Sequence, residues 1–510
     1  MINERKAGAV LQYLQMILSI VISLIYTPVM IRTLGQGEYG IYNLASSIIS
    51  YLSLLSLGFG ASYIHFYTKS KAQNEENGVR RLNGMFMAVF VLIAIIALFS
   101  GLVLSFNVDK FFTADGYTAK DMRIARILMV FLSVNLALSF PASVFTSYIT
   151  SQEKFIFQKI INMGKTVLSP MLTLPVLLLG FGSIGMVVIT TVITVIIDII
   201  NALYCIFKLK MRFEFKQFPY KLFKEIAIFS VFIAINQIVD QINWNVGKII
   251  LAKMMSKEAV AVYAVAATIN TMYISVSTAI SSVFTPQIHR IVVNKTDNCN
   301  QQLTAIFTKV GRVQYAILML ILSGFIFFGK YFVLIWSGPE YSEAYITALL
   351  LIIPATIALV QNVGIEIQRA KNKHRFRSLV YLGMAIINVF ASIILCNIFG
   401  IVGVAIGTAA SLIIVNGLIM NIYYYVKLKI DVLQFWKQII RMSCGLIVPV
   451  ILGVVILLKI QFNSIIQFLL MVMVYTMVYS LSMWFLGLNN YEKDLIISPI
   501  KKIIKRNSKL

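Results

Sequence analysis

Charged residues are scarce in this sequence. They make up 13% of its 510 residues, whereas 59% are hydrophobic. A soluble domain carries about 25% charged residues, so the composition excludes an ordinary soluble fold. Apolar runs of about eighteen residues or more recur along the whole chain, and such runs cross a bilayer as helices. They are continuous rather than alternating, which excludes an outer-membrane β-barrel. The sequence therefore predicts an all-α polytopic membrane protein.

Residues that bind metals or carry out catalysis are also few. The chain has 4 cysteines and 3 histidines, and the cysteines have neither the spacing of a zinc site nor that of a disulfide framework. No phosphate-binding glycine loop, HExxH or GxSxG motif is present. We therefore expect no enzyme: no catalytic residue, no metal and no bound cofactor.

Acidic residues are outnumbered, 20 against 44 basic ones, which gives a net charge of +24. The basic residues cluster in alternate short connections between the apolar runs, as the positive-inside rule requires. This placement argues against nucleic acid as a partner and puts both termini in the cytoplasm. Examples of such clusters are Lys69 and Lys71, Lys208 and Lys210, Lys309 and Arg312, and Lys427 and Lys429.

The apolar runs predict about fourteen membrane spans. The first is too long for a signal peptide and is expected to stay uncleaved. No connection is long enough to hold a domain outside the membrane. The spans run approximately over 7–31, 39–66, 84–106, 122–148, 160–180, 184–207, 225–250, 259–288, 310–336, 341–369, 378–399, 401–426, 439–460 and 464–486.

Short segments of the two halves match in the same order. The segments at 32–42 and 253–263 match at an offset of 221, and those at 181–185 and 399–403 at an offset of 218. Repeats of six spans share their topology and are related by an axis along the membrane normal. We therefore predict two pseudo-symmetric six-helix lobes plus two C-terminal helices. The predicted parts are an N-lobe at 1–207, a cytoplasmic linker at 208–224, a C-lobe at 225–426, spans thirteen and fourteen at 427–488, and a basic cytoplasmic tail at 489–510.

The span at 225–250 contains groups that hydrocarbon rejects. Polar residues survive in a bilayer only when they face protein or a water-filled cavity, so we predict that this helix lines a pathway. Asp240 lies roughly 22 Å from the cytoplasmic start of the helix; the alternative is a structural carboxylate tied to a neighbouring Lys or amide. The polar residues are Asn236, Gln237, Asp240, Gln241, Asn243, Asn245 and Lys248, of which Asn236, Asp240 and Asn243 share one stripe with Gly247.

Arg32 and Lys253 occupy matching places just past the outer ends of spans one and seven. Arginine binds phosphate with two parallel hydrogen bonds and lysine binds it as a point charge. Alternatively, both side chains snorkel to the interface. Lys248 lies deeper in the span than Lys253 and is the better cavity candidate. Gln15 belongs to a milder polar stripe on span one.

Two more charged residues lie within spans. Lys165 is about 9 Å from the cytoplasmic end of span five, within reach of substrate but also of the interface. Asp198 in span six has no basic residue near it in the sequence, so its partner must come from another helix, and Lys165 is one option.

The stretch Pro28–Tyr42, PVMIRTLGQGEYGIY, resembles the span-one to span-two signature of Wzx-type polysaccharide flippases. That group shares a superfamily with multidrug exporters of the MATE type and the lipid II flippase. The resemblance implies MATE-like lobes around a V-shaped cavity lined by spans one, two, seven and eight. The implied substrate is an undecaprenyl-diphosphate-linked oligosaccharide, moved by alternating access from the inner to the outer leaflet of the bacterial cytoplasmic membrane. Such proteins serve O-antigen (lipopolysaccharide), capsule or exopolysaccharide synthesis.

The resemblance also implies coupling to a proton or Na⁺ gradient, for which Asp198 and Asp240 are the candidates. Expected partners are the lipid-linked oligosaccharide, membrane lipids and polysaccharide polymerase or assembly proteins, with the chain itself a monomer. A MATE-like cation-coupled multidrug antiporter is the alternative and would favour an acidic cavity. Here the three basic residues Lys165, Lys248 and Arg32 outnumber the two carboxylates, which favours an anionic substrate. A lipid scramblase or an assembly scaffold is a third reading.

Overall fold

The computed structural model describes residues 4–72, 76–112, 116–216, 220–294, 297–371, 373, 375–462, 464–495 and 497–498. These residues form helices and short connections, with no strand among them. Most of the predicted basic tail, from residue 499 onward, lies outside the described residues. The all-α prediction is confirmed.

By the contacts among its residues the chain divides into two compact units. Unit 1 holds residues 1–268 and 375–411, and unit 2 holds residues 269–374 and 412–510. Helix α8 (Lys257–Ser282) continues from the first unit into the second. The helices of unit 1 are α1 (Glu4–Ser50), α2 (Phe59–Ala72), α3 (Glu76–Phe106), α4 (Ala119–Ser151), α5 (Phe155–Leu178), α6 (Gly182–Leu203), α7 (Tyr220–Met254) and α13 (Arg375–Leu412).

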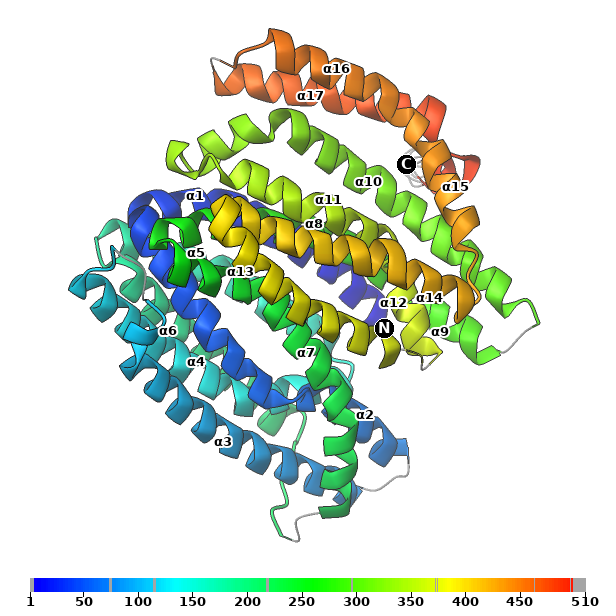
Figure 1. Ribbon diagram of the computed structural model, residues 1–510. Helices are drawn as coiled ribbons and strands as arrows, with labels where there is room; N and C mark the ends of the chain where they lie inside the picture. Colours follow the sequence, from blue (N-terminus) through cyan, green and yellow to red (C-terminus); the bar gives the residue numbers. More distant parts are fainter. Residues whose placement is uncertain are drawn as a thin grey trace, which may run out of the picture. The chain divides into compact units, whose positions relative to one another are not determined.

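Unit 2 is built on the long helix α10 (Cys299–Trp336). Helices α16 (Ile447–Lys459) and α17 (Ile465–Ser482) form a hairpin that packs along α10 (Figure 1). The amphipathic helix α15 (Val432–Ser443) buries Phe435 and Ile439 against the same helix. The remaining helices are α9 (Thr285–Asn294), α11 (Ala344–Val360), α12 (Val363–Ala370) and α14 (Met420–Val426).

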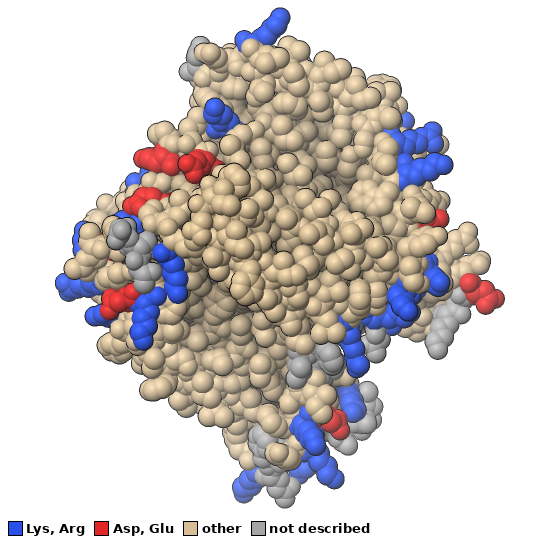
Figure 2. Space-filling view, in the orientation of Figure 1, with Lys and Arg blue, Asp and Glu red and all other residues tan. Residues whose placement is uncertain are grey.

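Among the described residues, ten helices are long and apolar enough to cross a membrane. The number rises to twelve if α7, and α11 together with α12, each count as one bent span. Exposed apolar side chains such as Phe99 and Leu178 suit contact with lipid. Figure 2 shows a face on which charged side chains lie toward the margins, with a wide uncharged area between them. The chain is a multi-pass membrane protein.

Two of the ten long helical segments are broken at a glycine. Gly35 in α1 has φ 72° and ψ 166°, and Gly400 in α13 has φ 58° and ψ −132°. A positive φ is readily adopted only by glycine. Predicted spans one and two meet near Gly35, and spans eleven and twelve meet at Gly400. Each predicted span falls mostly on helical structure. The number of fourteen membrane crossings and the boundaries of the two lobes stay predictions.

Unit 1 has an aromatic core where α2, α3 and α4 meet. Tyr63, Phe86 and Phe90 are almost fully buried, and the rings of Tyr63 and Phe86 meet edge to face at 5.0 Å. The Tyr63 hydroxyl donates to Asn83 Oδ1 at 2.5 Å. Between helices in lipid, packing and hydrogen bonds rather than the hydrophobic effect hold such contacts together.

The signature stretch Pro28–Tyr42 lies where α1 meets α6 and α8. After the break at Gly35, Glu38 accepts hydrogen bonds from the backbone N–H and the hydroxyl of Ser183, both at 2.6 Å, at the start of α6. A carboxylate at a helix N-terminus also interacts favourably with the helix dipole. A Cβ on Gly40 would lie 1.9 Å from the Lys257 carbonyl oxygen, so only glycine lets α8 begin this close to α1.

Candidate functional site

The second predicted span is interrupted beside α7. After α1 ends, residues Tyr51–Ser56 form a 3-10 turn, Leu57 and Gly58 have φ 46° and 73°, and α2 begins at Phe59. Irregular backbone within a membrane is tolerated only where protein buries it or where it lines a water-filled cavity. One of the polar groups in this segment is satisfied within it, because the Ser53 hydroxyl donates a hydrogen bond to the carbonyl oxygen of Ser50 at 2.6 Å.

Gln241 of α7 provides most of the remaining contacts to this turn. Its Oε1 accepts from the Ser50 hydroxyl at 3.1 Å and from Asn245 Nδ2 at 2.6 Å, and its Nε2 donates to Ser53 Oγ at 3.2 Å. Its backbone oxygen accepts from the Tyr51 hydroxyl at 3.2 Å. One turn earlier on α7, Gln237 Oε1 accepts from Ser56 at 3.5 Å. We call Ser50, Ser53, Ser56, Gln237, Gln241 and Asn245 the amide–serine seam.

The stripe predicted on α7 has mixed surroundings. Asn236 Oδ1 accepts from the Ser378 hydroxyl of α13 at 3.2 Å. A Cβ on Gly247 would lie 3.0 Å from Tyr263 and Val404, so this residue is packed against helices. Asp240 is exposed and Asn243 is half-buried. The stripe thus joins two packing contacts with one exposed and one half-buried position, and its role as a pathway stays a prediction.

Lys248 is half-buried and makes no hydrogen bond or ion pair with the residues that the structure describes. Lys253 is exposed, with its ammonium 6.0 Å from the centre of the Phe111 ring, and Arg32 is exposed as well. Gln15 has a buried Oε1 without a hydrogen-bond partner among the described residues. A half-buried cation without a charge partner and an unsatisfied carboxamide are both costly in a membrane helix, and their role in binding stays a prediction.

Asp198 and Lys165 lie on the adjoining helices α6 and α5. Lys165 is close enough for its charge to attract the Asp198 carboxylate. Nevertheless, Asp198 Oδ2 is buried and has no hydrogen-bond partner within the described parts of the chain. The structure thus brings the two predicted residues near each other, and whether Asp198 takes up an ion stays a prediction.

Two groups of polar residues were not found from the sequence. Lys257 Nζ lies 2.5 Å from Asp121 Oδ2, and Asp121 also forms a capping box with Thr118 at the start of α4. The Thr118–Asp121 spacing signals a helix start, but nothing in the sequence assigns Lys257 to it. In α13 the buried Asn388 donates to Thr408 at 3.4 Å and accepts from Ser392 at 3.0 Å. The described residues hold no group of three His, Cys, Asp or Glu side chains suited to a metal ion.

The chain is similar to several known proteins. The family model described as "Polysaccharide biosynthesis protein" matches residues 7–292. Over 422 residues the chain is 22% identical to the uncharacterized membrane protein EpsK of Bacillus subtilis (strain 168), covering 80% of each. The fold is similar to that of the lipid II flippase MurJ in its inward closed conformation, with a TM-score of 0.68 at 14% identity over 96% of this chain and 100% of that one. It is also similar to the MATE multidrug transporter DinF-BH, with a TM-score of 0.62 at 16% identity over 83% of this chain and 95% of that one.

The matched residues 7–292 include every candidate site residue and the whole amide–serine seam. The structural similarities lie at low identity and show the fold, which is the MATE-like helical architecture that the sequence predicts. The family match covers more than half of the chain and confirms the resemblance to polysaccharide flippases at the level of the family. The chain belongs to the family of polysaccharide biosynthesis proteins.

Proposed function

We propose that this protein moves an undecaprenyl-diphosphate-linked oligosaccharide from the inner to the outer leaflet of the bacterial cytoplasmic membrane. The observation that supports this most is the arrangement around α7. There the amide–serine seam meets an interrupted membrane helix, and Lys248 has no charge partner among the described residues. Amides and serines that bond to each other also hold membrane helices together, but a lysine without a charge partner inside a span points to a functional site.

The chemistry of the substrate matches these side chains. A diphosphate is attracted by Lys248 and Lys165, since a lysine ammonium binds phosphate as a point charge. Sugar hydroxyls exchange hydrogen bonds with carboxamides and hydroxyls, and Gln15 offers an unsatisfied oxygen for this purpose. The lipid tail stays in the bilayer while the head group crosses along the polar helix.

Translocation by alternating access requires helices that bend at defined places. The breaks at Gly35 and Gly400 and the turn at Tyr51–Ser56 are such places. A proton or Na⁺ gradient would bias the cycle. Of the two coupling candidates, Asp198 has a buried carboxylate oxygen without a hydrogen-bond partner among the described residues, and Asp240 is exposed. This favours Asp198 as the residue that takes up the ion.

The proposed setting is the synthesis of a cell-surface polysaccharide, with both termini in the cytoplasm. The chain would act as a monomer that hands its product to a polysaccharide polymerase or assembly protein.

The proposal is tested by transport in vesicles. The full-length protein is reconstituted with a fluorescent undecaprenyl-diphosphate oligosaccharide, and the head groups that reach the opposite leaflet are measured by added quencher, with and without an ion gradient. We expect transfer that accelerates when a gradient is imposed. Efflux of cationic dyes without transfer of the glycolipid would overturn the proposal in favour of a multidrug antiporter. Transfer of every phospholipid at the same rate would identify a scramblase.

A further inference from the structure

Unit 2 contains a polar pocket at the end of α10 that is predicted to face the cytoplasm. Its volume is about 440 Å³, and it lies between the first turns of α10, the helix α15 and the segment that follows α17. This volume is within the range of sites that hold a small molecule or a lipid headgroup. None of the described residues that line the pocket belongs to α7 or is a candidate for the transport pathway.

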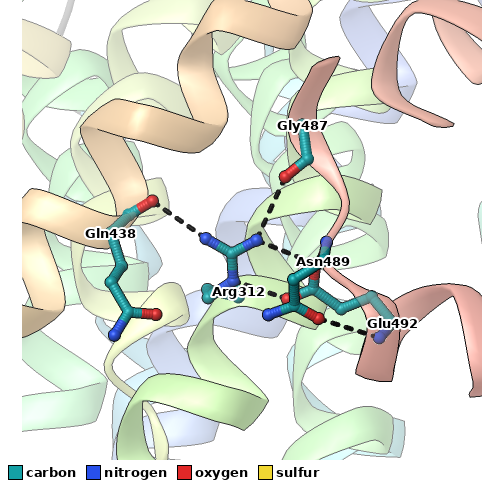
Figure 3. A network of polar contacts seen from close by, with 5 residues as sticks. All are labelled: Arg312, Gln438, Gly487, Asn489 and Glu492. Carbon is teal, nitrogen blue, oxygen red and sulfur yellow. Dashed lines mark hydrogen bonds and ion pairs between the residues drawn. The ribbon is translucent and has the colours of Figure 1, made fainter. Parts of the chain in front are cut away.

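Arg312 lines the pocket and is the centre of a network of polar contacts (Figure 3). Its Nε and Nη2 donate to the two oxygens of Glu492 at 2.5 and 2.8 Å. Its other hydrogen bonds go to the backbone oxygens of Gln438 at 3.0 Å and Gly487 at 3.1 Å. Arg312 and Glu492 are almost fully buried. Helix α15 and the segment after α17 are thus both bonded to a single guanidinium group of α10, whose charge is balanced by Glu492.

The charged residues that line the pocket are basic. None of the described residues that line it is acidic. The ammonium of Lys309 lies 3.4 Å from the centre of the Tyr491 ring and forms no ion pair with any residue that the structure describes. Asn489 Oδ1 already accepts from the Glu492 N–H at 3.0 Å, so the free group of this side chain is its Nδ2 donor. Because the charge of Arg312 is balanced, Lys309 gives the lining a net positive charge.

A second observation points to a missing ligand. Thr308 lines the pocket and is 6% exposed, and its hydroxyl has no hydrogen-bond partner among the described residues. A hydroxyl on a helix normally donates to a backbone oxygen of the preceding turn, as Thr268 does to Ala264 at 2.8 Å. A buried polar group left without a hydrogen bond costs about 1–3 kcal/mol. The hydroxyl oxygen itself is buried, so a ligand oxygen in the pocket would remove this cost only by displacing the side chains that cover it.

We propose that this pocket binds a phosphate ester or phosphate anion on the cytoplasmic side of the protein. Lys309 supplies the charge, and Thr308, Asn489 and Gln434 supply hydrogen-bond donors. A phosphate here bridges α10, α15 and the chain at Asn489. The headgroup of an anionic phospholipid and a soluble phosphate offer the same chemistry, and the inner leaflet next to this predicted side is anionic.

The test measures binding by the full-length protein in a non-ionic detergent. The probes are dihexanoyl phosphatidylglycerol, inorganic phosphate and, as a zwitterionic control, dihexanoyl phosphatidylcholine, all at matched ionic strength. Dissociation constants are obtained from the shift of the thermal unfolding midpoint, since a ligand of the folded state stabilises it. We expect phosphatidylglycerol, inorganic phosphate or both to bind, and phosphatidylcholine not to.

Three variants locate the site. Lys309→Gln and Thr308→Val should each weaken binding about tenfold, as the loss of a charge-assisted hydrogen bond does. Lys437→Gln, an exposed lysine of α15 outside the pocket, should change it less than about twofold. Binding of phosphatidylglycerol alone identifies the lipid source, and binding of inorganic phosphate identifies the soluble one. No binding of either anion, or equal binding by wild type and both pocket variants, would overturn the proposal. Transport is not measured, so the outcome is independent of the proposed function.

Discussion

The ammonium group of Lys257, the first residue of α8, lies 2.5 Å from the carboxylate of Asp121 in the first turn of α4. Both side chains are mostly buried, 19% and 12% exposed. Both residues belong to unit 1, and the pair joins α4 to α8, which the sequence assigns to different predicted lobes, at ends that the charge distribution predicts to lie on the outer side.

Asp121 takes part in both the ion pair and the capping box, whereas Lys257 takes part only in the ion pair. Substitutions of the two residues should therefore lower the stability by different amounts. Asp121→Asn loses the ion pair and weakens the capping box with Thr118, whereas Lys257→Gln loses only the ion pair. The Asp121 variant should be less stable than the Lys257 variant by about 1 kcal/mol, the usual contribution of a helix cap. Thermal unfolding of the purified protein checks this. A larger loss in Lys257→Gln would mean that the cap contributes nothing.

The buried pair of Arg312 and Glu492 should be essential to unit 2. Replacing one partner leaves an uncompensated charge, which costs about 3–5 kcal/mol. We expect Arg312→Met and Glu492→Gln each to lower the unfolding midpoint strongly. The double variant should lose less stability than the two single variants lose together, because it leaves no buried charge. Strictly additive losses would show that the two side chains act independently.

The amide–serine seam should be required for transport. Gln241→Leu removes the side-chain hydrogen bonds to Ser50, Ser53 and Asn245 and should reduce glycolipid transfer about tenfold or more, since each neutral hydrogen bond contributes about 1 kcal/mol. The matched control is Asn397→Leu, an exposed amide of α13, which should keep its activity. If both variants are equally active in the vesicle assay, the amide–serine seam is not required for transport.

The lysines within spans should matter more than those at the rim. Lys248→Ala and Lys165→Ala should each slow transfer about tenfold or more, because charge-assisted contacts contribute about 1.5–3 kcal/mol. Arg123 is exposed near the start of α4, and Arg123→Ala should retain most of the activity. Comparable rates for all three variants would place the pathway elsewhere.

Coupling to the gradient should depend on Asp198. Asp198→Asn keeps the size of the side chain and removes its capacity to release a proton, so the variant should transfer glycolipid at a rate that no longer responds to a gradient. Asp240→Asn is the comparison, and its response to the gradient should be kept. If Asp240→Asn alone abolishes the response, the exposed carboxylate is the coupling residue.

The sequence predicted the helices well because their apolar runs are long and their ends carry charge or glycine. It also singled out α7, since polar residues in a span stand out by composition alone. It did not predict which face of α7 contacts which neighbour. Asn236 and Gln237 are adjacent in sequence, yet one contacts α13 and the other the turn at Tyr51–Ser56. That difference depends on how distant segments pack against each other, and the periodicity of the sequence carries no information about this packing.

The Arg312 network illustrates the same limit. In the sequence Arg312 is one of many basic residues near a cytoplasmic span end, and Glu492 follows 180 positions later. Nothing local distinguishes a buried arginine from a solvated one. The break at Tyr51–Ser56 was missed because its serines and leucines fit an apolar run, although three serines at three-residue spacing before Gly58 are a weak signal of it.

The joint formed by Gly35, Glu38 and Gly40 is built from contacts that do not depend on α7. The contacts described above are a turn in α1, the hydrogen bonds of Glu38 at the N-terminus of α6 and the close approach of Gly40 to the backbone at Lys257. None of them involves the amide–serine seam. Substitutions along α7 therefore leave the most recognisable stretch of the sequence with the same partners.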